Sequence, residues 1–326
     1  MSSYFVKPIF GGFPFGASDG KSFRDVESIE KVYKLLEEAG CDTIDTARVY
    51  GDSEEWLGKT GAGKRFTLDT KTPGGFYPGS STGDGILQHA KESLELLGVK
   101  SVDVFYIHAP DASVELEDQL RGINEAYKAG YFKRFGLSNF KAADVQRVYD
   151  ICKAKGYPLP TVYQGNYNAV TRKLETEIVP TVRKLGMALY VYSPMAGGLL
   201  TRTSEQLREG SQAAGRYAQG HAAEAMYRAV YNTPNYLKAL DLWGEAASLV
   251  GCSRGELAYR WVAFDSVVDP KHGDAILFSA SKHSQVTETL KWLKAGSVGE
   301  AAKAKIEEIW KLIEHEAPLD NFHSTQ

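Results

Sequence analysis

The amino-acid sequence predicts a parallel (β/α)8 barrel, and three observations support this prediction. Short β-branched or aromatic runs alternate with segments of helical periodicity along the chain, as in βαβ units. There are eight such runs, and 326 residues are enough for one barrel. An open dinucleotide-binding sheet usually carries a Gly-x-Gly-x-x-Gly turn after its first strand, whereas Gly11, Gly12 and Gly16 have a different spacing.

The predicted strands are short runs that end at turn residues or at polar side chains. They cover residues 7–10, 43–45, 66–71, 102–108, 132–137, 161–165, 188–192 and 275–279.

The predicted helices lie between these strands and cover residues 28–39, 84–97, 116–128, 141–155, 175–185, 236–250 and 254–264. Ser22, Asp84 and Ser253 stand where a side-chain oxygen can cap a helix N-terminus. Glycines that typically end helices follow several of these segments: Gly40, Gly98, Gly130, Gly156 and Gly186.

Two segments depart from the alternation. Residues 200–234 form a long insertion between the seventh and eighth strands, which in a barrel lies over the catalytic face and can act as a lid. Residues 299–326 add a helix that we expect over the same face. No linker or repeat interrupts the chain, so we expect residues 1–326 to form a single domain.

Composition and charge argue against several classes of protein, among them nucleic-acid-binding and membrane-spanning proteins. The net charge is −3, and the basic residues form no stripe that would bind a nucleic acid. No apolar run reaches the roughly 20 residues that cross a bilayer, and the first residues do not resemble a secretion signal, so we expect a cytoplasmic protein. The three cysteines are widely spaced and fit neither a disulfide framework nor a zinc site, and we expect no metal.

Polar residues gather at the strand ends that a barrel brings to one face. They are Asp45, Tyr50 one loop later, Lys71, His108, Ser138, Asn139, Gln164, Tyr192 and Ser193. A buried Lys71 or Asp45 alone would be costly, so we expect the two to pair. A nearby ammonium lowers the pKa of a phenol, which would make Tyr50 a usable proton donor.

Carbonyl reduction needs such a proton donor together with a hydride from a cofactor. His108 can orient the carbonyl oxygen, and the charge of Lys71 can stabilise negative charge on it. Tyr192 offers a flat face for a nicotinamide ring, while Ser138, Asn139 and Gln164 offer hydrogen bonds to its carboxamide.

These residues carry a resemblance to the aldo-keto reductase superfamily. CDTIDTARVYGDSEEWLG resembles the segment with the catalytic Asp and Tyr, LDTK the strand that ends in the catalytic Lys, and VDVFYIHAPD the strand that ends in the catalytic His. GLSNF matches a nicotinamide-binding Ser-Asn pair, and PTVYQGNYNAVTRKLETEIVP, YVYSPMAGGLLT and HGDAILFSAS are similar to the aflatoxin-aldehyde and succinic-semialdehyde reductase branch. The resemblance runs from about residue 9 to 315.

The resemblance implies NADPH as cofactor and reduction of an aldehyde or ketone, with Asp45, Tyr50, Lys71 and His108 as the catalytic residues. It places cofactor contacts at Ser138, Asn139, Gln164, Tyr192, Ser193, Met195, Gly197, Gly198, Ser281, Lys282 and Gln285. A 2′-phosphate needs a cation, and Arg216 and Lys282 are the two candidates.

Substrate contacts are less constrained, and the candidates are Trp56 and Tyr231. The branch tends to carry Tyr-Arg-x-Arg in the lid, where this chain has Tyr227-Arg228-Ala229-Val230. Without a second guanidinium, a neutral or aromatic carbonyl is the expected substrate rather than a carboxylate-bearing one.

Two other functions compete with this one. The same barrel serves as an NADPH-binding regulatory subunit with little turnover, and a barrel hydrolase would need paired carboxylates or a metal at the strand ends. The resemblance also implies a homodimer.

Overall fold

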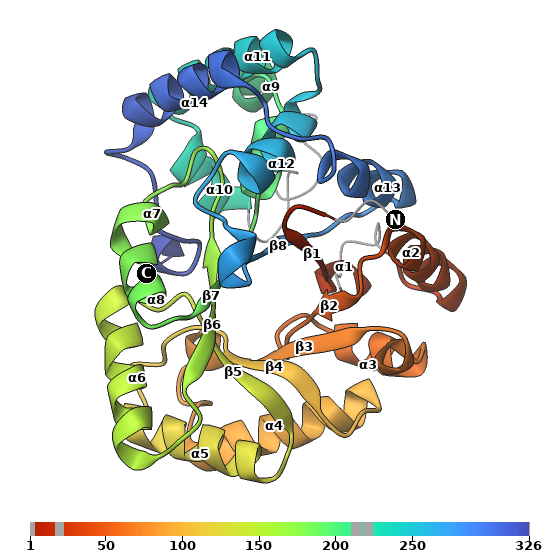
Figure 1. The fold of residues 1–326 in the computed structure, drawn as a ribbon, viewed down its shortest axis with the longest axis vertical. Helices are drawn as coiled ribbons and strands as arrows, with labels where there is room; N and C mark the ends of the chain where they lie inside the picture. Colours follow the sequence, from red (N-terminus) through yellow and green to blue (C-terminus); the bar gives the residue numbers. More distant parts are fainter. Residues whose placement is uncertain (1–3, 17–22, 210–216, 218–223, 326) are drawn as a thin grey trace.

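Eight parallel strands form a closed barrel in the computed structural model, which describes residues 4–16, 23–209, 217 and 224–325. The strands follow one another in sequence order, and β1 pairs with both β2 and β8 (Figure 1). Each of the eight predicted strands is confirmed, with ends that differ by at most one residue. The strands are β1 Lys7–Gly11, β2 Thr43–Asp45, β3 Thr67–Thr72, β4 Val102–Ile107, β5 Phe132–Ser138, β6 Pro160–Asn166, β7 Ala188–Tyr192 and β8 Ala275–Phe278.

Helices surround this barrel (Figure 1). The predicted helix over residues 175–185 is two helices, because Pro180 has no backbone N–H and starts a new helix near its own position. The α-helices are α1 Phe13–Gly16, α2 Val26–Ala39, α3 Ser53–Lys59, α4 Gly83–Leu97, α5 Leu116–Lys128, α6 Ala142–Lys155, α7 Leu174–Glu177, α8 Val179–Lys184, α9 Ser204–Glu209, α10 Glu224–Tyr231, α11 Pro234–Val250, α12 Arg254–Phe264, α13 His283–Trp292 and α14 Glu300–Ile313. Short 3-10 turns include η2 Gly74–Phe76, η3 Ala196–Thr201 and η6 His323–Thr325.

Helix ends follow the predicted chemistry with one correction. Ser253 caps α12 as predicted, and the glycines expected to end helices all have φ between 64° and 78°. The prediction of Asp84 as a cap is wrong, since the Thr82 hydroxyl accepts the first-turn hydrogen bond of α4 and Asp84 lies inside that turn. Ser22 lies outside the described residues, and the side chain that caps α2 is Asp25.

The barrel interior changes from apolar to polar along its axis. Alternate strand residues point inward, and the apolar ones that do so are Ile9, Val104, Tyr106, Val162, Ala188, Tyr190, Ala275 and Leu277. A larger apolar cluster fills the space between the strands and the outer helices. Two residues beyond Tyr106 and Val162, on the same faces of β4 and β6, stand His108 and Gln164, so the carboxyl ends of the strands carry the polar layer.

The insertion and the tail both reach this polar end. The described parts of the insertion form η3, α9 and α10. Helix α14 packs along α11, and its Glu307 and Trp310 contact Arg172 in the segment after β6. The chain after α14 then places Phe322 against Phe76, with ring centroids 5.2 Å apart.

Candidate active site

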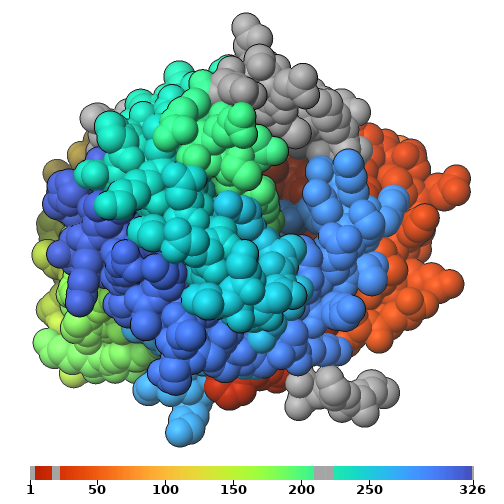
Figure 2. Space-filling model, turned by 90° about the horizontal axis from the view of Figure 1, so that it is seen from above, coloured from red at the N-terminus to blue at the C-terminus, as the bar shows by residue number. Residues whose placement is uncertain are grey.

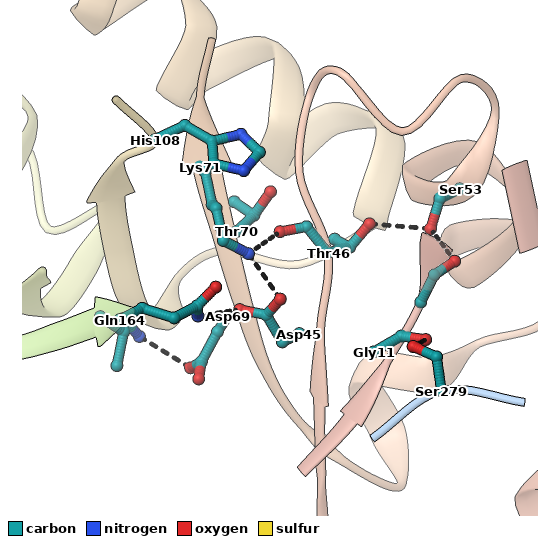
Figure 3. A network of polar contacts seen from close by, with 12 residues as sticks. Gly11, Asp45, Thr46, Ser53, Asp69, Thr70, Lys71, His108, Gln164 and Ser279 are labelled. Carbon is teal, nitrogen blue, oxygen red and sulfur yellow. Dashed lines mark hydrogen bonds and ion pairs between the residues drawn. The ribbon is translucent and has the colours of Figure 1, made fainter. Parts of the chain in front are cut away.

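A fully buried ion pair stands at the centre of the polar layer. Lys71 on β3 donates hydrogen bonds from Nζ to Asp45 Oδ2 at 2.5 Å and to the Thr46 carbonyl oxygen at 2.8 Å (Figure 3). Gln164 Nε2 on β6 donates to Asp45 Oδ1 at 3.0 Å. Burial raises the pKa of the Asp45 carboxyl, and the Lys71 ammonium and the Gln164 amide oppose that rise. The predicted pairing of Asp45 with Lys71 is therefore confirmed.

Tyr50 lies beside this pair, in the loop after β2. Lys71 Nζ is 5.4 Å from the centroid of the Tyr50 ring. The loop is fixed to the barrel because the Arg48 N–H donates to the Lys71 carbonyl oxygen at 3.2 Å, and the Tyr50 N–H donates to the Ala47 carbonyl oxygen at 3.0 Å. The phenol is half-buried, so it is adjacent to the ammonium and still reachable from outside.

His108 completes the group. Its ring meets the Tyr50 ring edge-on, with centroids 5.6 Å apart and an interplanar angle of 77°. Burial, and secondarily the Lys71 charge, hold the pKa of His108 well below its usual value, so the imidazole is neutral near pH 7. Its Nδ1 has no hydrogen-bond partner among the described residues.

The ends of β5 and β7 supply a second set of polar groups. The Tyr192 hydroxyl donates to Asn139 Oδ1 at 2.7 Å, and Asn139 Nδ2 donates to the His108 carbonyl oxygen at 2.9 Å. Asn139 and Ser193 have φ of 61° and 58°, a left-handed conformation that costs energy in residues other than glycine. The buried Ser138 Oγ has no partner among the described residues.

Three of the predicted cofactor contacts lie in or directly before the turn η3. Gly197 and Gly198 have φ of 65° and 99°, and Met195 precedes them. A Cβ on Gly197 would come within 2.2 Å of the Tyr227 ring, whereas one on Gly198 would meet open space. The glycine pair thus lets the chain turn closely against α10 without a side chain.

The remaining predicted contacts lie at the start of α13, after β8. The Ser281 N–H donates to Gln285 Oε1 at 3.0 Å, and Lys282 is the exposed N-cap residue of the helix. Arg216 lies outside the described residues.

The two predicted substrate contacts have packing neighbours. Trp56 on α3 packs against the main apolar cluster, with Lys59 Nζ 4.6 Å from its ring centroid. Tyr231 on α10 is buried, and its hydroxyl forms a hydrogen bond of 3.3 Å with the Thr171 hydroxyl.

Three phenylalanines that sequence reasoning missed pack around Tyr50 and His108, and we call them the aromatic rim. Phe13 meets the Tyr50 ring at 5.3 Å, Phe76 meets the His108 ring at 4.7 Å, and Phe322 packs on Phe76 at 5.2 Å. Phe13 and Phe76 follow β1 and β3 in glycine-rich turns, which was an available signal for loops at the catalytic face. No local pattern marks Phe322.

Within the described ranges, no cluster of three or more His, Cys, Asp or Glu is arranged to hold a metal ion. No helix in the same part of the chain is both long and apolar enough to cross a membrane.

Comparisons of the sequence with known proteins identify a family and several relatives. A sequence model of the Aldo/keto reductase family matches residues 9–311. The chain is 37% identical over 317 residues to a Leptosphaeria maculans protein named Oxidoreductase sirO, a match that covers 95% of both chains. It is 34% identical over 315 residues to Homo sapiens Aldo-keto reductase family 7 member A3, covering 93% of this chain and 95% of the relative. It is 31% identical over 322 residues to Rattus norvegicus Aflatoxin B1 aldehyde reductase member 2, covering 95% and 88% respectively.

Proposed function

Because this chain belongs to the aldo/keto reductase family, we propose that it reduces an aldehyde or ketone to an alcohol with NADPH, and that Tyr50 donates the proton. One observation carries the assignment of the acid: the half-buried Tyr50 ring lies close to both the Lys71 ammonium, 5.4 Å from its centroid, and the His108 ring, 5.6 Å away.

The neighbours of Tyr50 leave it the best proton donor of the group. The pKa of His108 lies well below its usual value, so the neutral imidazole is a poor acid near pH 7. Lys71 is held by Asp45 and by the Thr46 carbonyl oxygen. A phenol beside a buried ammonium loses its proton more easily, because the positive charge stabilises the phenolate.

The other site residues then orient the substrate carbonyl and stabilise the negative charge that develops on its oxygen. His108 donates a hydrogen bond to the carbonyl oxygen and fixes its direction, while the Lys71 charge stabilises negative charge that develops on this oxygen through the phenol. Asp45 and Gln164 keep the ammonium and the carboxylate in place. The Tyr50 hydroxyl proton moves to the carbonyl oxygen, which leaves the site as the alcohol oxygen.

The residues present fit a nicotinamide cofactor, which when bound would supply the hydride. Ser138 Oγ is buried without a protein partner in the described chain, so it is ready to bind a carboxamide beside Asn139 and Gln164. Tyr192 lies next to them, with its hydroxyl already bonded to Asn139. Seen from above, the surface is hollowed between the green segment after β7 and the blue segment of α13 (Figure 2).

The start of α13 supports NADPH over NADH. Helix N-termini that follow the last barrel strands are common phosphate sites, since their free N–H groups and dipole attract anions. Lys282 stands at this N-terminus and can add a charge for a 2′-phosphate, with Arg216 as the second candidate.

The aromatic rim supports a neutral aromatic carbonyl substrate. Phe13 and Phe76 are partly exposed rings in contact with Tyr50 and His108, and the buried Phe322 ring packs behind Phe76. Arg228 in the lid is bonded to Glu224 at 2.8 Å, which reduces its attraction for a substrate carboxylate. Two of the relatives are named as aflatoxin B1 aldehyde reductases, so their names also point to an aldehyde substrate.

Substitution of Tyr50 by Phe tests the acid. We expect kcat for an aromatic aldehyde to fall at least about a hundredfold, because the proton donor is lost while the ring remains. NADPH binding, followed by quenching of protein fluorescence, should stay within about twofold, because no predicted cofactor contact changes. Tyr33→Phe, which removes a buried hydroxyl on α2 away from the site, is the matched control and should keep its turnover.

The same experiment separates the enzyme from a regulatory subunit on this barrel. Equal, very low turnover in the wild type and in Tyr50→Phe, with intact NADPH binding, would contradict the enzymatic function and support the regulatory role.

We also propose that the protein is located in the cytoplasm. The free thiols of Cys41, Cys152 and Cys252 are in line with a reducing compartment.

A further inference from the structure

A second buried carboxyl lies beneath the catalytic group, and the proposed reaction does not use it. Asp69 stands on β3 two residues before Lys71 and is fully buried. In the parallel pairing of β2 and β3 its Cα is the direct partner of the Asp45 Cα, and Figure 3 shows Asp45, Asp69 and Lys71 close together. Asp69 Oδ1 accepts a hydrogen bond from the Val104 N–H at 3.0 Å, and Oδ2 has no partner in the described chain.

This position places two buried carboxyls on directly paired strand residues, and only one of them is bonded to an ammonium. Lys71 donates to Asp45 and not to Asp69. Like charges on directly opposed strand residues repel, and burial adds a desolvation cost to each. Burial, followed by repulsion from Asp45, raises the pKa of Asp69 to about 7. Asp69 therefore binds a proton below neutral pH and carries a negative charge above it.

The surroundings of Asp69 supply little compensation. The charged or titratable groups that face it are Asp45 on β2, Lys71 on β3, Asp103 and Tyr106 on β4, Arg134 on β5 and Tyr190 on β7. The one guanidinium among them, Arg134, is bonded to Asp103 at 2.7 Å and to the Tyr190 hydroxyl at 3.0 Å. Asp69 thus has no dedicated cation in this group.

We propose that Asp69 is a positioning residue which, by holding or releasing a proton beside the Lys71–Asp45 pair, sets the pH range in which Tyr50 is an effective proton donor. The inference rests on the proposed function, because it assigns a role in the same proton transfer. Asp69 acts through Asp45 and Lys71 and does not touch the substrate.

The direction of the effect follows from the sign of the charge. Ionised Asp69 offsets part of the Lys71 charge, so the phenolate of Tyr50 is stabilised less and the phenol becomes a weaker acid. We expect reduction to slow by about three- to tenfold as the pH rises through 7, in addition to any loss caused by Tyr50 itself.

Asp69→Asn tests this, because the amide keeps the shape and the acceptor for Val104 N–H while it removes the charge. Reduction of an aromatic aldehyde is measured as kcat/KM from pH 5.5 to 10, and the fall near pH 7 should be absent from the variant. Asp42→Asn is the control, since it removes an exposed carboxylate that pairs with Lys7 and is not among the groups that face Asp69, and it should retain that fall. Asp69→Ser is the second variant if the amide prevents folding.

A spectroscopic titration makes the result independent of turnover. Tyrosinate absorbance is recorded against pH with and without the additional change Tyr50→Phe, so that the difference reports Tyr50 alone. In Asp69→Asn the Tyr50 midpoint should move down by about one pH unit.

An unchanged midpoint together with an unchanged pH profile would overturn the role of Asp69. Absence of turnover in the wild type would overturn the proposed function instead, and a shifted midpoint would then still support the coupling of Asp69 to Tyr50.

Discussion

At the scale of single residues, buried charge is the feature on which the candidate site depends. Lys71 and Asp45 are both fully buried, and the ammonium is bonded to one carboxylate and one carbonyl oxygen. Such a pair contributes little net stability compared with an apolar core, because desolvation offsets the attraction. The position of this pair beside Tyr50 is therefore explained by its chemical role and not by a contribution to stability.

Asp69 adds a pH dependence to the stability of the protein. Its pKa is raised from 3.8 to about 7, so between these values the folded chain binds a proton that the unfolded chain releases. Stability is therefore lost as the pH rises through this window and is level above it.

Asp69→Asn should remove that loss. Relative to the wild type, the free energy of unfolding in urea should rise between pH 4 and 7, with a limit of about 4 kcal/mol for a shift of this size. A difference between the two proteins that is the same at pH 5 and pH 8 would contradict this expectation. Asp42→Asn, an exposed carboxylate at the start of β2, serves as the control.

Some residues of the site could be predicted from the sequence and others could not, for a physical reason. Asp45, Lys71 and His108 could be found because strand ends of a barrel converge. Asp69 lies two residues before Lys71 on β3. Because side chains alternate between the two faces of a strand, the sequence could also have predicted that Asp69 points into the barrel. Phe322 could not be found, since its position depends on how the tail folds back.

At the scale of secondary-structure elements, the start of a helix depends on which side chain accepts a hydrogen bond from an unpaired backbone N–H of the first turn. In α4 the Thr82 hydroxyl accepts from the Gly85 N–H at 3.1 Å. Asp84 is one residue inside the helix, where its carboxylate can favour the dipole but cannot cap the end. Both residue types are good caps, so the sequence alone did not separate them.

This difference can be measured. Thr82→Ala should lower the free energy of unfolding by about 1 kcal/mol, because one first-turn N–H loses its acceptor. Asp84→Ala should change it by less than about 0.5 kcal/mol, since the Asp84 side chain is 89% exposed and its pair with Arg121 is a surface contact. Equilibrium urea unfolding of both variants checks the order, and the reverse order would restore Asp84 as the cap.

At the scale of the whole molecule, closure of the barrel assembles the site from distant parts of the chain. The aromatic rim combines a residue after β1, a residue after β3 and a residue from the C-terminal segment. Because α14 packs along α11, the chain after it is directed back to the catalytic face, where η6 contacts α10.

Phe322→Ala should therefore alter substrate choice and leave the barrel intact. We expect KM for an aromatic aldehyde to rise about tenfold, because Phe76, which contacts His108, loses the buried ring that packs against it. KM for a short aliphatic aldehyde should change by less than about twofold. Phe5→Ala removes a ring that stacks on Phe264 next to β1, and this control should leave both KM values unchanged. Equal losses for both aldehydes would argue against a rim that selects aromatic substrates.

The sequence by itself determined the order of strands and helices, the barrel class and the four candidate catalytic residues. It could do so because these features depend on local periodicity, on turn chemistry and on the convergence of strand ends, all of which can be recognised in short segments of sequence. Only the tertiary structure decided which charges share one buried space and which rings pack around Tyr50 and His108. The opposition of Asp69 to Asp45 depends on strand register, and the contact of Phe322 with Phe76 depends on the path of the tail. Both join residues far apart in the chain, and no local pattern fixes such distances.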